Sequence, residues 1–130
     1  MTQLHQYLSR VHTTILSRQE VIIETLEIFD HSDKAGQSSE FYAVLRFYDN
    51  SRLQIMEKLI VDAYALLKVR YAYHYQQANS TLIFRYDNAP HHPTVETHPH
   101  HKHIGADVVA CTPPDISQLL REIDEILYKE

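Results

Sequence analysis

Only one of the 130 residues is a cysteine, Cys111, and the chain has two glycines and no tryptophan. A single cysteine cannot form a disulfide within the chain, which is typical of a reducing compartment. No apolar run approaches the ~18 residues that a membrane span needs, and the first ten residues lack the apolar segment of a signal peptide. From these absences we expect a cytoplasmic protein that has no contact with a membrane.

The composition is that of one ordinary folded domain over residues 1–130. The formal net charge is −5 with histidine neutral, so any contact with nucleic acid requires a local basic patch. Two residue types are concentrated. Six of the ten histidines lie at positions 91–103, and four of the nine tyrosines lie at positions 64–75. These two clusters are the first candidates for a functional surface.

Apolar residues recur at helical spacing near both ends of the chain. Near the N-terminus they are Leu4, Leu8, Val11 and Ile15. They predict a helix over residues 2–16, which Thr2 would cap. Near the C-terminus, Asp115 followed by Gln118 has the signature of a capping box, and an amphipathic run follows. We expect a second helix beginning after Asp115.

Between these helices, β-branched and aromatic runs alternate with turn formers. The expected strands are residues 21–29, 40–48, 52–61, 68–76, 81–86 and a short one at 107–111. We expect a loop at residues 31–39, a tight turn at Asn50 and irregular backbone at residues 87–103, which contain three prolines. Short turns between successive strands predict an antiparallel arrangement. The predicted fold class is α+β: an antiparallel β-meander of about five to six strands with an N-terminal and a C-terminal helix packed on one face.

The strand predicted at residues 68–76 has two unlike faces, because alternate side chains point in opposite directions. One face carries Val69, Tyr71, Tyr73 and Tyr75, and the other carries Lys68, Arg70, Ala72 and His74. The next strand adds Arg85, which would extend the basic row. In the plain interpretation the tyrosines belong to the core and the basic row faces solvent. In the alternative, cations and aromatic rings bind single-stranded nucleic acid.

Glu57 interrupts an apolar row in the strand predicted at residues 52–61. A buried carboxylate requires a proton or a cationic neighbour. The plain interpretation is an ion pair with a nearby arginine or lysine. The functional interpretation is a carboxylate of the active site, because perturbed ionisable groups gather at such sites.

The segment RYDNAPHHPTVETHPHHKHIG, residues 85–105, has three interpretations. Imidazole is a common metal ligand, although the spacings match no standard zinc motif. Alternatively, a histidine pair removes and donates protons, with Lys102 and Arg85 compensating the charge of an RNA-cleavage transition state. In the third, the loop simply caps the sheet. Because residues two apart in extended backbone share a side, we expect His101 and His103 to face one way.

The block YAYHYQQANSTLIFRYDNAPHHP, followed by THPHHKHIG, resembles the TumE-type toxin family, formerly a domain of unknown function. The resemblance covers residues 70–105, and the closing PPDISQLLREIDEI is similar to the family's terminal helix. The N-terminal half fits in size and order without a distinctive motif. The resemblance implies a toxin of a two-gene toxin–antitoxin module, whose partner is a cognate helix-turn-helix antitoxin protein.

The resemblance also implies which residues matter. The matching positions are Tyr73, His74 and Tyr75, then Arg85, Tyr86, Asp87 and Asn88, then His91 and His92, and finally His100, His101, Lys102 and His103. Where the family pattern has an aromatic residue before a proline, this chain has His98. We therefore expect His98 to be the loop histidine with the least functional importance.

Our leading hypothesis is a toxin that acts on RNA as a metal-independent, histidine-based ribonuclease without a cofactor. Its catalytic candidates are His91, His92, His101, His103 and Asp87, and its nucleic-acid-binding candidates are Arg70, Tyr73, His74, Tyr75, Arg85 and Lys102. Histidines from the two ends of the segment would act as base and acid, and Asp87 would orient one of them. Lys102 and Arg85 would hold phosphate, and a tyrosine would stack on a base.

Two alternatives stay open. The first is a non-enzymatic module that binds a protein or a nucleic acid. The second is a metal-dependent hydrolase, in which Glu57 or Asp87 joins two or three histidines of the loop. A meander also has two edge strands, which would allow a homodimer.

Overall fold

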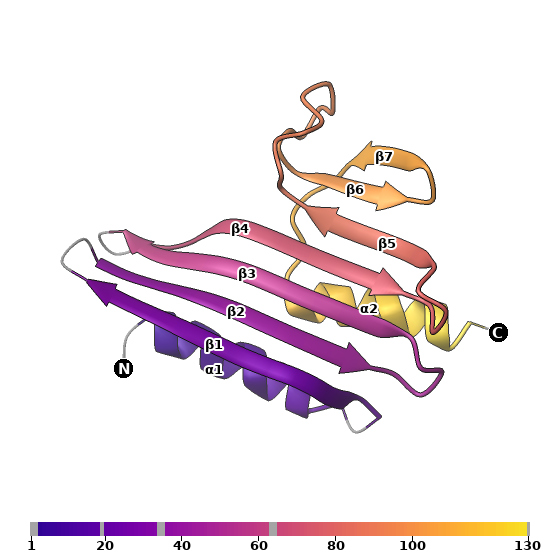
Figure 1. Cartoon of the computed structure of the whole chain (residues 1–130), viewed down its shortest axis with the longest axis horizontal. Helices are drawn as coiled ribbons and strands as arrows, with labels where there is room; N and C mark the ends of the chain where they lie inside the picture. The colour runs from indigo at the N-terminus through magenta and orange to yellow at the C-terminus, as the bar shows by residue number, and fades with distance from the viewer. Residues whose placement is uncertain (1–2, 19, 34–35, 63–64, 130) are drawn as a thin grey trace.

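The computed structural model describes residues 3–18, 20–33, 36–62 and 65–129. Seven strands form one antiparallel sheet, and both helices lie on the same face of it, behind the sheet in Figure 1. The elements are α1 (Gln3–Leu16), β1 (Ile22–Asp33), β2 (Gly36–Arg46), β3 (Arg52–Asp62), β4 (Ala65–Gln76), β5 (Leu82–Asp87), β6 (His101–Ile104), β7 (Asp107–Ala110) and α2 (Ile116–Leu127). The strand order in the sheet follows the chain.

This architecture confirms the α+β meander with terminal helices on one face, with seven strands instead of five or six. The capping box of α2 is also confirmed: the Asp115 side chain accepts from the Gln118 N–H, and the Gln118 side chain accepts from the Asp115 N–H. The predicted cap Thr2 lies outside the described residues. Neither helix in the described part of the chain is long and apolar enough to cross a membrane.

The core lies between the helices and one face of the sheet. The apolar stripe of α1 is buried, as is that of α2. Opposite them the sheet buries Phe41, Leu45, Leu53, Ile55, Tyr71, Tyr73, Tyr75 and Phe84. Burial of each such side chain contributes about 1.5–3 kcal/mol relative to exposure. The core therefore occupies the helix face of the sheet and leaves the other face, here called the open face, without a covering helix (Figure 1).

The first hairpin is longer than expected. Residues 31–39 were expected to form a loop, but β1 and β2 continue through residues 31–33 and 36–39, with His31 paired to Ser38. Pairing satisfies the backbone groups of the polar residues there. The sequence prediction failed because turn formers also occupy the end of a long hairpin.

A β-bulge changes the faces of β4. Lys58 pairs with Arg70 but the next residue, Leu59, pairs with Lys68, which leaves Val69 as the extra residue. The strand also begins at Ala65, before the predicted start. Lys68 therefore shares the helix face with Leu59, and its expected place in the basic row of Arg70 and His74 is wrong.

The histidine-rich segment is only partly irregular. We call residues 88–100 the histidine loop. The next four residues form strand β6, which pairs with β5 and β7, although the first three of them were expected to be irregular. Gly105, with φ of 58°, makes the turn into β7, a backbone angle that glycine adopts without strain. The predicted turn at Asn50 is confirmed by its φ of 66°.

Candidate functional site

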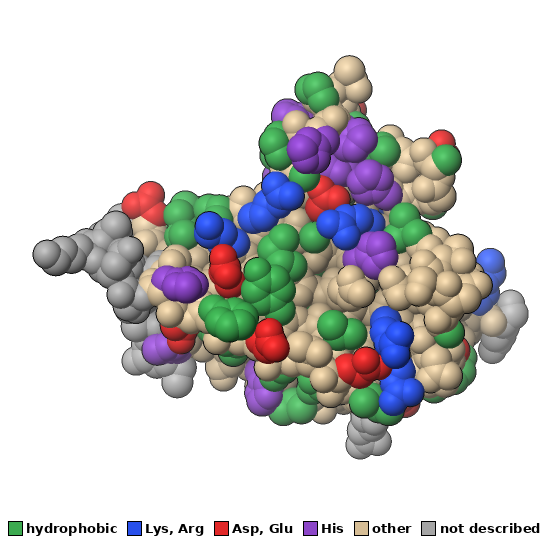
Figure 2. All heavy atoms as spheres, in the orientation of Figure 1, with side chains coloured by type: hydrophobic (Ala, Val, Ile, Leu, Met, Phe, Trp, Pro, Cys, Tyr) green, Lys and Arg blue, Asp and Glu red, His purple; other side chains and the backbone are tan. Residues whose placement is uncertain are grey.

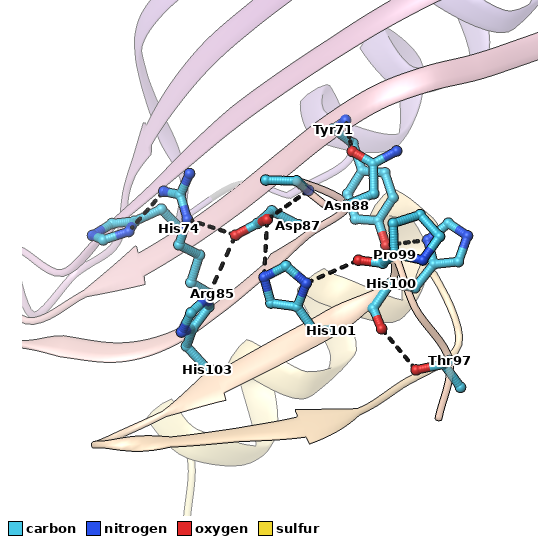
Figure 3. A network of polar contacts seen from close by, with 11 residues as sticks. Tyr71, His74, Arg85, Asp87, Asn88, Thr97, Pro99, His100, His101 and His103 are labelled. Carbon is cyan, nitrogen blue, oxygen red and sulfur yellow. Dashed lines mark hydrogen bonds and ion pairs between the residues drawn. The ribbon is translucent and has the colours of Figure 1, made fainter. Parts of the chain in front are cut away.

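The open face of β5 and β6 carries the candidate site (Figure 3). Register pairs Arg85 with His103, and Asp87 with His101. Paired residues of antiparallel strands share a face, so these four side chains lie together. Figure 2 shows histidines gathered on this face, with lysine, arginine and acidic side chains beside them. The expectation that His101 and His103 face the same way is confirmed.

Asp87 is the centre of the site and is only 4% exposed. Its Oδ1 accepts the Ala89 N–H at 2.9 Å and lies 3.0 Å from His101 Nε2. Its Oδ2 accepts from Arg85 Nε at 3.0 Å and lies 3.6 Å from His103 Nε2. Burial raises the pKa of Asp87, but the hydrogen bonds from Ala89 and Arg85 and the charges of Arg85 and His101 outweigh it and lower the pKa below its usual value. Asp87 is therefore a carboxylate at neutral pH.

His101 is 2% exposed, and both of its ring nitrogens face acceptors. Nδ1 lies 2.9 Å from the carbonyl oxygen of Pro99, which only accepts, so Nδ1 carries a proton and donates. Nε2 faces the carboxylate of Asp87, which also accepts only. A proton or another cation must therefore lie between Nε2 and Asp87. Because both ring nitrogens of His101 have partners and the ring is buried, His101 is not placed to take a proton from a substrate.

The ring of His92, from the histidine loop, completes a cluster of three imidazoles. Its centroid lies 4.8 Å from that of His101 and 5.4 Å from that of His103, and the last two are 4.9 Å apart. Burial and the charges of His101, His92 and Arg85 lower the pKa of His103, although Asp87 acts to raise it. His103 is therefore neutral at pH 7, and a quarter of its side chain is exposed.

Arg85 joins this cluster to β4. Its Nη1 donates to Nδ1 of His74 at 3.2 Å, which leaves Nε2–H of His74 to donate to Gln76 at 3.1 Å. Burial and the charge of Arg85 lower the pKa of His74, so this ring is neutral. The Arg85 side chain is 37% exposed, and its guanidinium group is available to an anion on the open face.

A shallow pocket of about 320 Å³ lies on the open face beside Arg85. Its side chains include Tyr42, Gln54, Met56 and His74. Sequence analysis did not single out the first three of these. Their signal was strand alternation combined with hairpin register, which pairs Tyr42 with Met56 and Gln54 with His74.

Other hydrogen bonds fix the histidine loop to the sheet. Tyr71 shares a hydrogen bond of 2.9 Å with Nδ1 of His100. The Asn88 side chain accepts the Tyr71 N–H and donates to the Val69 carbonyl. Thr97 donates to the carbonyl of His100 at 2.7 Å. His100 and Asn88 therefore hold the loop in place instead of facing an open site.

Lys102 does not lie in this cluster, although it stands between His101 and His103. It points to the helix face, where its Nζ donates to Glu122 at 2.7 Å and lies 4.8 Å from the ring centroid of Tyr86. The expected role of Lys102 in holding phosphate is thus wrong for this conformation. The strand alternation that unites the two histidines sends Lys102 the other way.

Tyr73 and Tyr75 are also misassigned as rings that stack on bases. Both are 0% exposed in the core, so neither ring offers a face to a ligand. Arg70 lies on the open face, paired with Lys58, but outside the Asp87 cluster. His91 is exposed, and among the contacts of the described residues it contributes a backbone hydrogen bond to Ala89.

Glu57 belongs to the core, as its plain interpretation predicted. Its fully buried carboxylate accepts from Tyr7 at 2.6 Å and from Tyr73, and Lys68 Nζ lies 2.9 Å from it. The bulge at Val69 is what brings Lys68 to this carboxylate. Glu57 is on the opposite face of the sheet from the Asp87 cluster, so it cannot join those histidines at one site.

Comparison with known families agrees with the histidine-rich block. The family model described as toxin TumE matches residues 12–128 of the chain. No curated protein and no solved structure matches. The match includes most of the N-terminal half, from residue 12 onward, where the sequence has no distinctive motif, as well as the whole Asp87 cluster. The chain belongs to the TumE toxin family.

Proposed function

We propose that this chain is the toxin of a two-gene toxin–antitoxin module and that it cleaves RNA in the cytoplasm. Membership of a toxin family supports the toxin role and, with it, an antitoxin partner. The observation that carries the RNA proposal is the group of Asp87, His103 and Arg85 on an open sheet face. A helix-turn-helix antitoxin and pairing of two chains through the edge strands belong to the same proposal.

Cleavage of RNA through its own 2′-hydroxyl requires a base, an acid and a cation. The base takes the hydroxyl proton as the 2′-oxygen attacks phosphorus, and the acid protonates the departing 5′-oxygen. His103 is suited to the base because it is neutral and a quarter exposed. His92 lies beside it as the complementary acid, and Arg85 binds the phosphate.

Two versions of this chemistry differ in what lies between His101 and Asp87. In the metal-independent version expected from the sequence, it is a proton, and His101 acts as a fixed positive charge. In the metal-dependent version it is a metal ion held by the three imidazoles, which would activate water or polarise the phosphate in place of the base and acid roles of His103 and His92. The grouping of three imidazole rings gives a specific reason to consider the second version.

The pocket beside Arg85 offers a place where a nucleobase can stack, which the buried rings of Tyr73 and Tyr75 cannot offer. Tyr42 is 37% exposed there and pairs with Met56 across the strands. An exposed aromatic ring and a cation that line one pocket are suited to bind the base and the phosphate of single-stranded nucleic acid. This arrangement supports unpaired RNA as the target.

The test is induced expression of the chain alone and together with its neighbouring gene, with growth and RNA integrity read in the same cultures. We expect growth arrest with RNA fragmentation, both relieved by the neighbour. Asp87→Asn should abolish both effects, whereas His91→Ala, which changes an exposed neighbour of the cluster, should retain them. Each variant is compared at equal soluble protein level.

Arrest with intact RNA would keep the toxin role and overturn the ribonuclease. It would favour the non-enzymatic module instead, particularly if His103→Gln were still toxic. Full toxicity in Asp87→Asn, at the same soluble protein level as the wild type, would place the active surface elsewhere. Loss of toxicity in a folded His91→Ala would restore His91 to the site.

A further inference from the structure

One ligand-capable nitrogen from each of His92, His101 and His103 lies within 4.8 Å of the others. Nitrogens that bind one zinc ion at about 2.1 Å in a tetrahedron lie about 3.4 Å apart. The rings of His92 and His103 are half-buried, so side-chain rotation can close this difference without moving the sheet. We propose that these three histidines bind a divalent transition-metal ion of the zinc class, beside the carboxylate of Asp87.

The contact between His101 and Asp87 supports this proposal. Two ligands of one metal ion approach each other to about 3.0–3.4 Å, since each lies about 2.1 Å from the ion. The distance from His101 Nε2 to Asp87 Oδ1 is 3.0 Å, and that from His103 Nε2 to Asp87 Oδ2 is 3.6 Å. His101 Nε2 thus faces the carboxylate at the spacing of neighbouring ligands, and His103 Nε2 lies slightly beyond that range.

Hydrogen bonds from neighbouring groups fix the orientation of His101 and Asp87, as is usual for the ligands of metal sites. A histidine that binds a metal through one nitrogen usually donates its other N–H to a carbonyl or a carboxylate. His101 donates Nδ1–H to the Pro99 carbonyl at 2.9 Å, which directs Nε2 inward. Asp87 is itself fixed by the Ala89 N–H and by Arg85.

The donor atoms of the cluster indicate the class of ion, and the charges around it indicate how many ions bind. Three imidazoles with one carboxylate are nitrogen-rich, which suits Zn²⁺, Co²⁺ or Ni²⁺ better than the oxygen-preferring Mg²⁺ or Ca²⁺. Arg85 offsets the charge of Asp87 from its Oδ2 side, and this cation also opposes a second ion there. We therefore expect one metal ion per chain.

The three proposed ligands come from strand β6 and from the histidine loop, which accounts for their spacing in the sequence. His101 and His103 are two residues apart on one face of β6, and His92 comes from the histidine loop that covers them. The exposed His91 serves as a matched control, because it is the chain neighbour of His92 but lies outside the group of three. A metal tied to the cluster must depend on His92 and not on His91.

The experiment uses the full-length chain without a polyhistidine tag, freed of metal by a chelator and titrated with Zn²⁺ by calorimetry. We expect one ion per chain, and a Kd that rises at least tenfold in His92→Ala and in His103→Ala and less than twofold in His91→Ala. Bound Co²⁺ should give the visible spectrum of a nitrogen-ligated ion in the wild type, and this spectrum should be lost in His92→Ala. Circular dichroism verifies that each variant is folded.

Equal affinities for Zn²⁺ in His92→Ala and His91→Ala would overturn the site. A titration of the wild type that does not saturate at one ion per chain would overturn it too. If the alanine variants do not fold, His92→Gln replaces them, because glutamine cannot bind a metal ion as imidazole does. Its Kd for Zn²⁺ is again compared with that of His91→Ala. Where the proposed RNA cleavage holds, the metal belongs to that same site. The binding test needs no RNA, so a chain that binds Zn²⁺ without cutting RNA overturns the function alone, and a chain that cuts RNA without binding Zn²⁺ overturns the metal site alone.

Discussion

The hydroxyl of Tyr73 donates a hydrogen bond to the carboxylate of Glu57, and both side chains are fully buried between α1 and the sheet. Tyr7 donates to the other oxygen of the same carboxylate, and the ammonium group of Lys68 lies 2.9 Å away. A buried carboxylate is tolerated only when it is paired and hydrogen-bonded. This group therefore links α1 to the sheet through polar contacts inside the core.

Tyr73→Phe should lower the free energy of unfolding by about 1.5–3 kcal/mol, because it removes a hydrogen bond to a buried charged group. Tyr48→Phe is the matched control, since its hydroxyl donates to the Leu127 carbonyl in an exposed position. It should change stability by less than about 0.5 kcal/mol. Urea unfolding followed by circular dichroism measures both. Similar losses in the two variants would contradict the buried role of Tyr73.

The chain should lose stability at alkaline pH. Burial, and next the negative charge and hydrogen bond of Glu57, raise the pKa of Tyr7 and of Tyr73 well above the usual value. Tyrosines of the unfolded chain ionise near pH ~10, so the contribution of each neutral tyrosine is complete below that pH and declines as pH rises towards the folded pKa. The decline is about 1.4 kcal/mol per pH unit for each tyrosine.

The measurement is urea unfolding at intervals from pH 8 to pH ~11, where tyrosines of unfolded chains lose their protons. Tyr73→Phe should show a shallower decline than the wild type, because one tyrosine with a raised pKa is gone. An equal decline in both proteins would show that Tyr73 is not the source.

Lys102→Gln should affect stability and not RNA binding. It removes an ion pair with Glu122 and a cation held over the ring of Tyr86, worth together about 1 kcal/mol. Arg85→Gln should instead weaken the affinity for a single-stranded oligoribonucleotide and reduce its dependence on salt. Binding is measured by fluorescence anisotropy at two salt concentrations. A greater loss of affinity in Lys102→Gln than in Arg85→Gln would reverse our assignment of the faces.

Tyr42→Ala should weaken binding of single-stranded RNA by about 1–3 kcal/mol, the usual contribution of one stacked base. Tyr128→Ala removes another exposed ring, one that stacks on Tyr48 near the C-terminus, and should leave affinity unchanged. Anisotropy titrations in the same buffer compare the two. Unchanged affinity in Tyr42→Ala would remove the pocket from the RNA-binding surface.

The sequence predicted the elements well where periodicity or capping was strong. The stripe of α1, the capping box of α2 and the turn at Asn50 all formed as expected. It failed at residues 31–39, because polar turn formers and the polar end of a long hairpin have the same composition. Whether such residues form a loop or the end of a hairpin depends on pairing between strands, which cannot be predicted from the local sequence.

The candidate site was predicted in part. Alternation placed His101 and His103 on one side, which the structure confirms. The same alternation, applied to Lys102, should have sent it to the other face, but its role was assigned from its charge and its position in the segment alone. The inversion of Lys68 could not be foreseen, because a single extra residue at Val69 shifts the register of β4 without a glycine or proline to mark it.

Strand order in this sheet follows the chain from β1 to β7. Each strand emerging from a ribosome therefore meets a partner that has already been made, so the sheet can grow one hairpin at a time. Asp87 meets His101 only when β6 is added, about four-fifths of the way through the chain. A chain built in this order carries an incomplete Asp87 cluster for most of its own synthesis, so the activity that we propose for this cluster would be absent until the last strands pair.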